Sequence, residues 1–120
     1  MIYDLEERLC EFSKSVLEFV RTVPDNLINR NILSQLIRAG TSIGANYCEA
    51  DNAESKKDFI HKIGICRKET KETKYWLKII ESVYFGQKEK LVELQQEAKE
   101  LNLIFNAMYI KLKKNNPRFL

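Results

Sequence analysis

Histidines, cysteines and paired carboxylates build most catalytic and metal sites in helical proteins, and this sequence holds few of them in a usable pattern. His61 is the single histidine, and Asp58 lies three residues before it. A di-iron site in a helix bundle needs a Glu-x-x-His pair on each of two helices, so one histidine cannot complete it. A serine or cysteine nucleophile needs a base, and His61 is the only imidazole on offer. We therefore predict no enzyme, no metal site and no cofactor.

The cysteines lie at positions typical of small apolar residues. Their odd number, their lack of paired spacing and the absence of an apolar leader argue against a secreted disulfide scaffold. The three residues are Cys10, Cys48 and Cys66, on or beside apolar positions. The longest apolar run spans the four residues 107–110, too short to cross a membrane. We expect a cytoplasmic protein with no membrane segment.

Basic side chains are concentrated in the second half of the chain. Residues 1–54 carry a net charge of −4 and residues 55–120 a net charge of +7. Such asymmetry indicates a nucleic-acid surface or an interface between subunits of opposite sign, although two halves packed together can also neutralise each other. The segment 55–83 holds eight basic residues against four acidic ones. The predicted phosphate contacts, which no recognisable reading motif accompanies, are Lys62, Arg67, Lys68, Lys71 and Lys74.

A polar stripe accompanies the apolar face of the segment 27–50. Its members, at spacings of 4, 4 and 3, are Arg38, Ser42, Asn46 and Glu49. Four polar residues also interrupt the apolar seam of the next segment, namely Glu69, Thr70, Glu72 and Thr73. We expect these groups to satisfy one another across the two helices and to set their register. The alternative is that Asn46 and Glu49 belong to a surface for a partner.

Four segments show the apolar spacing of amphipathic helices, alternating between 3 and 4 residues. Their apolar positions run from Leu5 to Val23, Ile32 to Ala50, Phe59 to Tyr84 and Leu91 to Leu112. We expect the second helix over about 27–50 and the third over 55–83, and Asn115, Asn116 and Pro117 end the fourth. Short turns between amphipathic helices favour antiparallel neighbours. The sequence therefore predicts one all-α domain over residues 1–120, an antiparallel up-down-up-down four-helix bundle.

Several residues have predicted roles at helix ends and helix contacts. Ser55, with Asp58 three residues later, resembles a capping box. Gly86 is placed to end the third helix in a left-handed conformation. Gly40 and Gly44 each cost a helix interior about 1 kcal/mol relative to alanine. They therefore indicate that another helix backbone approaches so closely that a side chain would be blocked.

The third predicted helix has more than one apolar stripe. Tyr75 and Trp76 are adjacent, so they cannot both point into the seam, and Ile79 with Val83 extends a second apolar line beside Trp76. An extra stripe is often buried between subunits, so we expect a homo-oligomer. A wide bundle core that takes up both stripes is the alternative.

Two adjoining segments resemble a known family. Residues 34–50, SQLIRAGTSIGANYCEA, are similar to the signature of the bacterial 23S rRNA intervening-sequence proteins, and residues 54–80, ESKKDFIHKIGICRKETKETKYWLKII, resemble the next helix of that family. The positions that carry the family's residue types are Ser34, Arg38, Ser42, Ile43, Asn46, Glu49, Ser55, Asp58 and Phe59. The chain departs from the family's common Asn-Ile-Ala-Glu-Gly at Tyr47, Cys48 and Ala50.

This resemblance implies an antiparallel four-helix bundle that assembles as a ring, typically a homopentamer. It also implies a relation to the accessory protein of diversity-generating retroelements, a pentameric bundle that binds nucleic acid and a reverse transcriptase. Two functions follow as expectations. The first is a non-enzymatic oligomer that binds RNA or DNA through a basic surface. The second is a protein–protein assembly or scaffold module, an accessory subunit for a protein such as a reverse transcriptase, without nucleic-acid binding.

Overall fold

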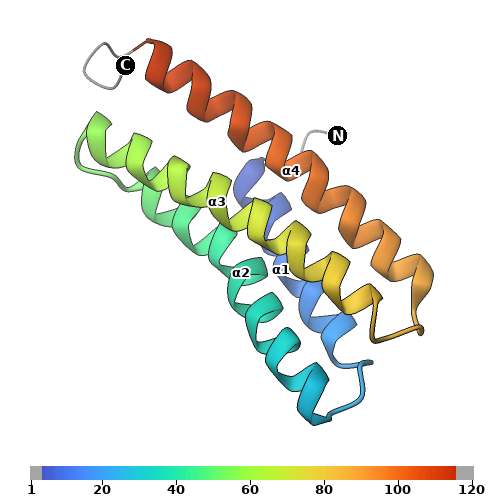
Figure 1. The fold of residues 1–120 in the computed structure, drawn as a ribbon. Helices are drawn as coiled ribbons and strands as arrows, with labels where there is room; N and C mark the ends of the chain where they lie inside the picture. Colours follow the sequence, from blue (N-terminus) through green and yellow to red (C-terminus); the bar gives the residue numbers. More distant parts are fainter. Residues whose placement is uncertain (1–3, 116–120) are drawn as a thin grey trace.

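Four helices make up most of residues 4–115, the part of the chain that the computed structural model describes. They are α1 (Leu5–Val20), α2 (Leu27–Asp51), α3 (Lys56–Glu81) and α4 (Lys88–Lys114), and no strand occurs within that range (Figure 1). The prediction of an all-α bundle of four helices is confirmed. Helix bounds differ from the predicted ones by one or two residues, except that Val23 lies beyond the end of α1 and is still buried. Asn116 and Pro117 lie outside the described residues.

The helices pack as neighbours in chain order, and the chain reverses direction at each loop (Figure 1). Contacts between α1 and α2 join early residues of one helix to late residues of the next: Glu6 meets Cys48, whereas the Ser13 hydroxyl donates to the carbonyl of Gly40. Among the pairs of helices that lie side by side, α2 and α3 make the most extensive contact and α1 and α4 make the least extensive one. A two-pronged ion pair closes the bundle there, with Arg8 Nη2 at 2.7 Å from Glu97 Oε1.

Three of the helices begin with a side-chain cap. The first backbone N–H groups of a helix have no partner inside it, and a polar residue just before the helix can accept from one of them. Asp4, Asn26 and Ser55 each accept from the N–H three residues later, at 2.7, 2.8 and 3.0 Å. The hydrogen bond from Asp58 N–H to Ser55 Oγ confirms the cap predicted for the third helix.

The turn between α3 and α4 differs from the sequence prediction. Gly86 does not adopt the left-handed conformation; the residue with a positive φ is Gln87, at 51°. Gly86 is needed for space instead, because a Cβ there would lie 2.6 Å from the hydroxyl oxygen of Tyr84. That hydroxyl donates to the carbonyl of Thr22 at 3.1 Å, so one tyrosine joins the α3–α4 turn to the α1–α2 turn. The prediction for Gly86 was therefore wrong.

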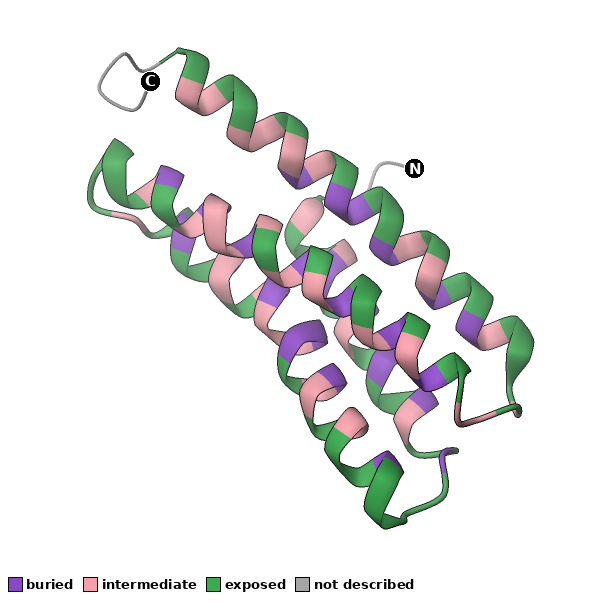
Figure 2. Cartoon of the chain, in the orientation of Figure 1, coloured by how far each residue is buried: buried purple, intermediate pink, exposed green. Residues whose placement is uncertain are grey.

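The core is built from apolar side chains of all four helices, and the buried positions recur along each helix (Figure 2). Fully burying a side chain of the size of leucine stabilises the fold by roughly 1.5–3 kcal/mol. The largest of these side chains are Phe19, Phe105, Leu9, Leu36, Ile43, Ile63, Leu77, Ile80 and Leu101. The core also holds polar groups: the amide of Asn102 on α4 donates to Thr70 Oγ1 on α3 at 2.9 Å. If α3 slid along α4, the amide of Asn102 and the hydroxyl of Thr70 would lose each other as partners. This bond therefore favours one register of α3 against α4.

The two glycines inside α2 face α1. A Cβ at Gly40 would lie 3.2 Å from Cγ2 of the fully buried Val16, whereas a Cβ at Gly44 would lie 3.5 Å from Leu9 Cβ and 3.8 Å from the Leu9 backbone. The predicted close approach of another helix backbone is confirmed at Gly44, whereas the close neighbour of Gly40 is the side chain of Val16. The prediction that a side chain would be blocked is wrong at Gly44, where a methyl group fits in ordinary contact.

We expect Gly44→Ala and Gly40→Ala to change stability differently. Gly44→Ala should raise the free energy of unfolding by about 0.5–1 kcal/mol, because alanine is the better helix former and the space is there. Gly40→Ala should give no gain or lose about 1 kcal/mol, since Val16 is buried and stiff. Urea unfolding measures both, with Ala45→Gly as the reverse substitution at an exposed position of the same helix. Equal gains for both variants would show that Val16 does not restrict the space at Gly40.

Candidate nucleic-acid interface

The solvent side of α3 carries lysines with no carboxylate among them. Lys68, Lys71, Tyr75 and Lys78 follow one another at spacings of 3, 4 and 3, so they share one face of the helix, and all four are exposed. We call these residues the α3 stripe. Within residues 4–115, none of the three lysines forms an ion pair with a carboxylate. Lys74, also exposed and without such a pair, borders the stripe.

Three of the four acidic residues of α3 make contacts with neighbouring helices. Glu69 and Glu72 both accept from the guanidinium of Arg38 on α2, and Arg38 Nη1 lies 3.2 Å from Glu69 Oε2. Glu72 also accepts from the indole Nε1 of Trp76 at 2.9 Å. Glu81, near the end of the helix, accepts from Gln95 on α4 at 3.2 Å. The lysines of the α3 stripe therefore keep their charge uncompensated by their own helix.

Two of the five predicted phosphate contacts are engaged by side chains of neighbouring helices. Lys62 lies 3.4 Å from Glu49 on α2, and only 24% of its side chain is exposed. The guanidinium of Arg67 lies over the ring of Tyr109 on α4, 4.2 Å from its centroid, where a cation–π attraction holds it. The other three predicted residues, Lys68, Lys71 and Lys74, remain exposed. Lys78 was not selected from the sequence, although its place four residues after Lys74 and seven after Lys71 carries the same signal.

The polar stripe of α2 makes two kinds of contact. Arg38 and Glu49 reach across to α3, where they meet Glu69, Glu72 and Lys62. Ser42 and Asn46 stay on their own helix: the Ser42 hydroxyl donates to the carbonyl of Arg38, and the Asn46 amide donates to that of Ser42 at 2.9 Å. The ends of the stripe thus join α2 to α3, while its middle bonds within α2.

Tyr75 and Trp76 are adjacent in the sequence but lie in different environments. Trp76 and Val83 are half-buried and pack against the core, so the bundle takes up that part of the second apolar stripe. Tyr75 remains 55% exposed, and its ring stands edge-on to that of Trp76 with centroids 5.0 Å apart and planes at 77°. Within the described residues, the Tyr75 hydroxyl has no hydrogen-bond partner. The α3 stripe therefore presents one aromatic ring between its lysines.

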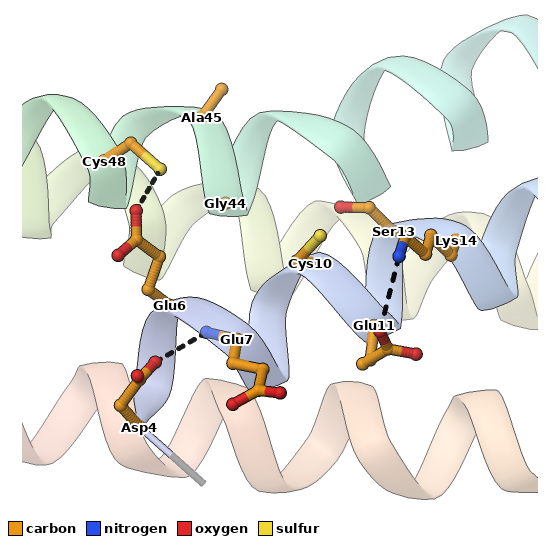
Figure 3. A pocket seen from close by; sticks show the side chains of 10 residues that line it. All are labelled: Asp4, Glu6, Glu7, Cys10, Glu11, Ser13, Lys14, Gly44, Ala45 and Cys48. Atoms are coloured by element: carbon orange, nitrogen blue, oxygen red, sulfur yellow. Dashed lines mark hydrogen bonds and ion pairs between the residues drawn. The ribbon is translucent and has the colours of Figure 1, made fainter.

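A groove with a volume of about 620 Å³ lies between α1 and α2, and acidic residues dominate its lining (Figure 3). Its lining includes the exposed thiols of Cys10 and Cys48. The Cys48 thiol donates to Glu6 Oε1 at 3.1 Å, and this hydrogen bond raises the pKa of Cys48. The thiol is then protonated at neutral pH and is a poor nucleophile. The residues that line this groove are Asp4, Glu6, Glu7, Cys10, Glu11, Ser13, Lys14, Gly44, Ala45 and Cys48.

His61 lies elsewhere, in a shallow hollow with Ser55, Asp58 and Tyr109. It is not among the residues that line the groove of Cys10 and Cys48, so no imidazole is placed beside either thiol. Among residues 4–115, no three histidine, cysteine or acidic side chains come together in a way that could hold a metal ion. None of the described helices is both long enough and apolar enough to cross a membrane.

We expect the three cysteines to react with iodoacetamide in a fixed order at pH 8. Cys10 is exposed and should react first. Cys48 should be slower because its raised pKa leaves less thiolate, and Cys66, buried with a pKa raised to about 12, should react only after unfolding. Glu6→Gln removes the charge that opposes ionisation, so it should speed the reaction of Cys48 and leave Cys10 as an internal control. Mass spectrometry of timed samples measures each rate, and Cys66 reacting as fast as Cys10 would contradict the buried position.

Comparisons with known proteins agree on the fold. The sequence model of the family described as 23S rRNA-intervening sequence protein matches residues 4–107. A crystal structure at 1.70 Å resolution, of a protein with unknown function from the S23 ribosomal protein family of Bacteroides thetaiotaomicron, is similar with a TM-score of 0.75 and 29% sequence identity. The similarity covers 88% of this chain and 98% of that one. No curated protein matches the chain significantly.

Proposed function

The chain belongs to the 23S rRNA-intervening sequence protein family, and we propose that it is a non-enzymatic oligomer that binds RNA or DNA through the α3 stripe. The observation that carries the proposal is the row of lysines Lys68, Lys71 and Lys78, exposed and without an ion pair among the described residues. Phosphate contacts made by lysine release counterions from the nucleic acid, and this supplies most of the affinity of a binder that does not read sequence.

The surroundings of the stripe support this proposal. A lysine already paired with a carboxylate gains little when it meets a phosphate, because the first contact must be given up. The two acids closest in sequence to these lysines, Glu69 and Glu72, are held by Arg38. The lysines stand on one straight helix, so their charges form a line about 15 Å long from Lys68 to Lys78 at 1.5 Å per residue. A linear array of cations suits a linear polyanion.

Self-assembly is the second part of the proposal, and a row of apolar residues on α4 favours it. Leu103 and Ile110 are spaced by 7 residues and are 59% and 61% exposed, and Ala107, which is also exposed, lies between them on the same side of the helix. Exposed apolar side chains that recur along one face are typical of a surface that another protein covers. We propose that a second copy of the chain covers the α4 row, in a ring such as the homopentamer that the family resemblance implies.

A double substitution in the α3 stripe tests nucleic-acid binding. Lys71→Gln/Lys78→Gln should weaken binding of a labelled RNA or DNA at least tenfold and should reduce the salt dependence, the slope of log K against log salt, by about 1.5–2. Fluorescence anisotropy at several salt concentrations measures both. Lys14→Gln/Lys90→Gln is the matched control: it removes the same charge from lysines already paired with Glu11 and Glu18. Equal weakening by both variants, or no binding at low salt, would refute the proposal.

A second pair of variants tests assembly through the α4 row. Leu103→Glu/Ile110→Glu should shift the protein from an oligomer to a monomer, because burying two carboxylates in an apolar contact is costly. Light scattering after size exclusion gives the mass, for which one chain contributes 14.1 kDa. Leu27→Glu/Ile28→Glu is the control, since these residues are 84% and 64% exposed at the start of α2, away from the row. A wild-type monomer at all concentrations would rule out this part of the proposal.

A further inference from the structure

We infer that the α3 stripe selects unpaired nucleotides, because Tyr75 offers its ring for stacking on a base while the lysines on either side hold the neighbouring phosphates. This inference rests on the proposed nucleic-acid binding and adds the class of ligand. The ligand is a single strand of RNA or DNA, or an unpaired loop, and a continuous duplex is the poorer ligand.

The position of Tyr75 within the stripe is the first support. Lys71 lies four residues before it and Lys78 three residues after it, which puts the two Cα atoms about 6 Å and 4.5 Å away along the helix axis. Each lysine side chain is long enough to reach a phosphate on its own side of the ring. A base lying on Tyr75 would therefore have a cation near the phosphate before it and another near the phosphate after it.

The ring of Tyr75 is held in place by its neighbour Trp76. Trp76 meets it edge-on, at 5.0 Å between centroids, and the indole of Trp76 is itself fixed by its hydrogen bond to Glu72. Glu72 in turn accepts from Arg38 on α2. A chain of contacts therefore runs from α2 through Glu72 and Trp76 to Tyr75. A ring already held in one orientation loses less conformational entropy when a base stacks on it than a free side chain would.

The chemistry of stacking decides between single strands and duplexes. Inside a duplex both faces of each base are covered by its neighbours, so an exposed tyrosine meets sugar, phosphate or base edges but no base face. In a single strand the bases can be splayed out, and every base has a face that an aromatic ring can cover whatever the sequence. Lysines contact both kinds of ligand, but Tyr75 distinguishes them. Since stacking releases no counterions, its contribution is independent of salt, unlike that of the lysines.

The test compares one aromatic substitution on two ligands. Tyr75→Ala should weaken binding of a single-stranded RNA or DNA of roughly 12 nucleotides by about tenfold. Binding of the duplex of the same sequence should change less than about twofold, and the salt slope should be unchanged, since no charge is removed. Tyr75→Phe should bind the single strand like wild type, because it keeps the ring. Phe85→Ala is the matched control, an aromatic residue 72% exposed in the turn after α3 and off the stripe. Fluorescence anisotropy gives the affinities, and light scattering shows whether the assembly is intact.

The remaining outcomes contradict the inference, and each shows which part of it is wrong. If Lys71→Gln/Lys78→Gln weakens binding but Tyr75→Ala does not, the stacking role fails and the proposed function stands. If Tyr75→Ala weakens both ligands equally, or dissociates an oligomer, Tyr75 supports the fold or the assembly and contacts no base. If Tyr75→Phe is as weak as Tyr75→Ala, the hydroxyl acts instead of the ring. If wild type binds neither ligand, the proposed function fails and the inference with it.

Discussion

The contact of Arg38 with Glu69 and Glu72 is the interaction on which the α3 surface depends. Its energy is modest, since 46% of the arginine side chain is exposed and exposed ion pairs contribute about 0–1 kcal/mol. Its consequence is geometric. By drawing both carboxylates toward α2, Arg38 leaves the three lysines and Tyr75 of the α3 stripe without a carboxylate among them. It also holds Glu72 where the indole of Trp76 can donate to it. One arginine thus determines the charge of the stripe and supports its aromatic ring.

The helical core is filled by packed side chains. Leu36, Ile63 and Leu77 are fully buried, and even the polar groups among them are paired, as Asn102 is with Thr70. Within residues 4–115, no buried side-chain nitrogen or oxygen lacks a partner. This packing makes the helices stiff. A helix packed on two neighbours along its length holds the exposed side chains of its outer face at constant spacing, which an isolated helix does not.

The fold was predictable from the sequence because its signals are local. The apolar spacing, the turn residues and the cap at Ser55 each act within a few residues, so four helices and their approximate ends could be deduced. Whether each lysine is paired with a carboxylate could not be predicted in this way. Lys62 and Lys71 look alike in the sequence, and only the approach of α2 places Glu49 beside Lys62. The turn at Gly86 shows the same limit, because the need for glycine there comes from the folded position of Tyr84.

The charge asymmetry of the chain is strengthened by folding. The acidic half contains few basic residues, and two of them, Arg8 and Arg38, bind acids of the basic half, Glu97 in one case and Glu69 with Glu72 in the other. These pairs neutralise basic residues of the acidic half and acidic residues of the basic half. Lys62 with Glu49 and Lys90 with Glu18 act the other way, but at 3.4 and 3.7 Å they are longer than the 2.7 Å contact of Arg8.

The net result is an acidic groove between α1 and α2, and a row of uncompensated lysines on α3, which is not an immediate neighbour of α1 in the bundle. If the protein binds nucleic acid as we propose, a polyanion that approaches the bundle would be repelled by the acidic groove and attracted by the α3 stripe. This difference would orient it on the stripe before any specific contact forms.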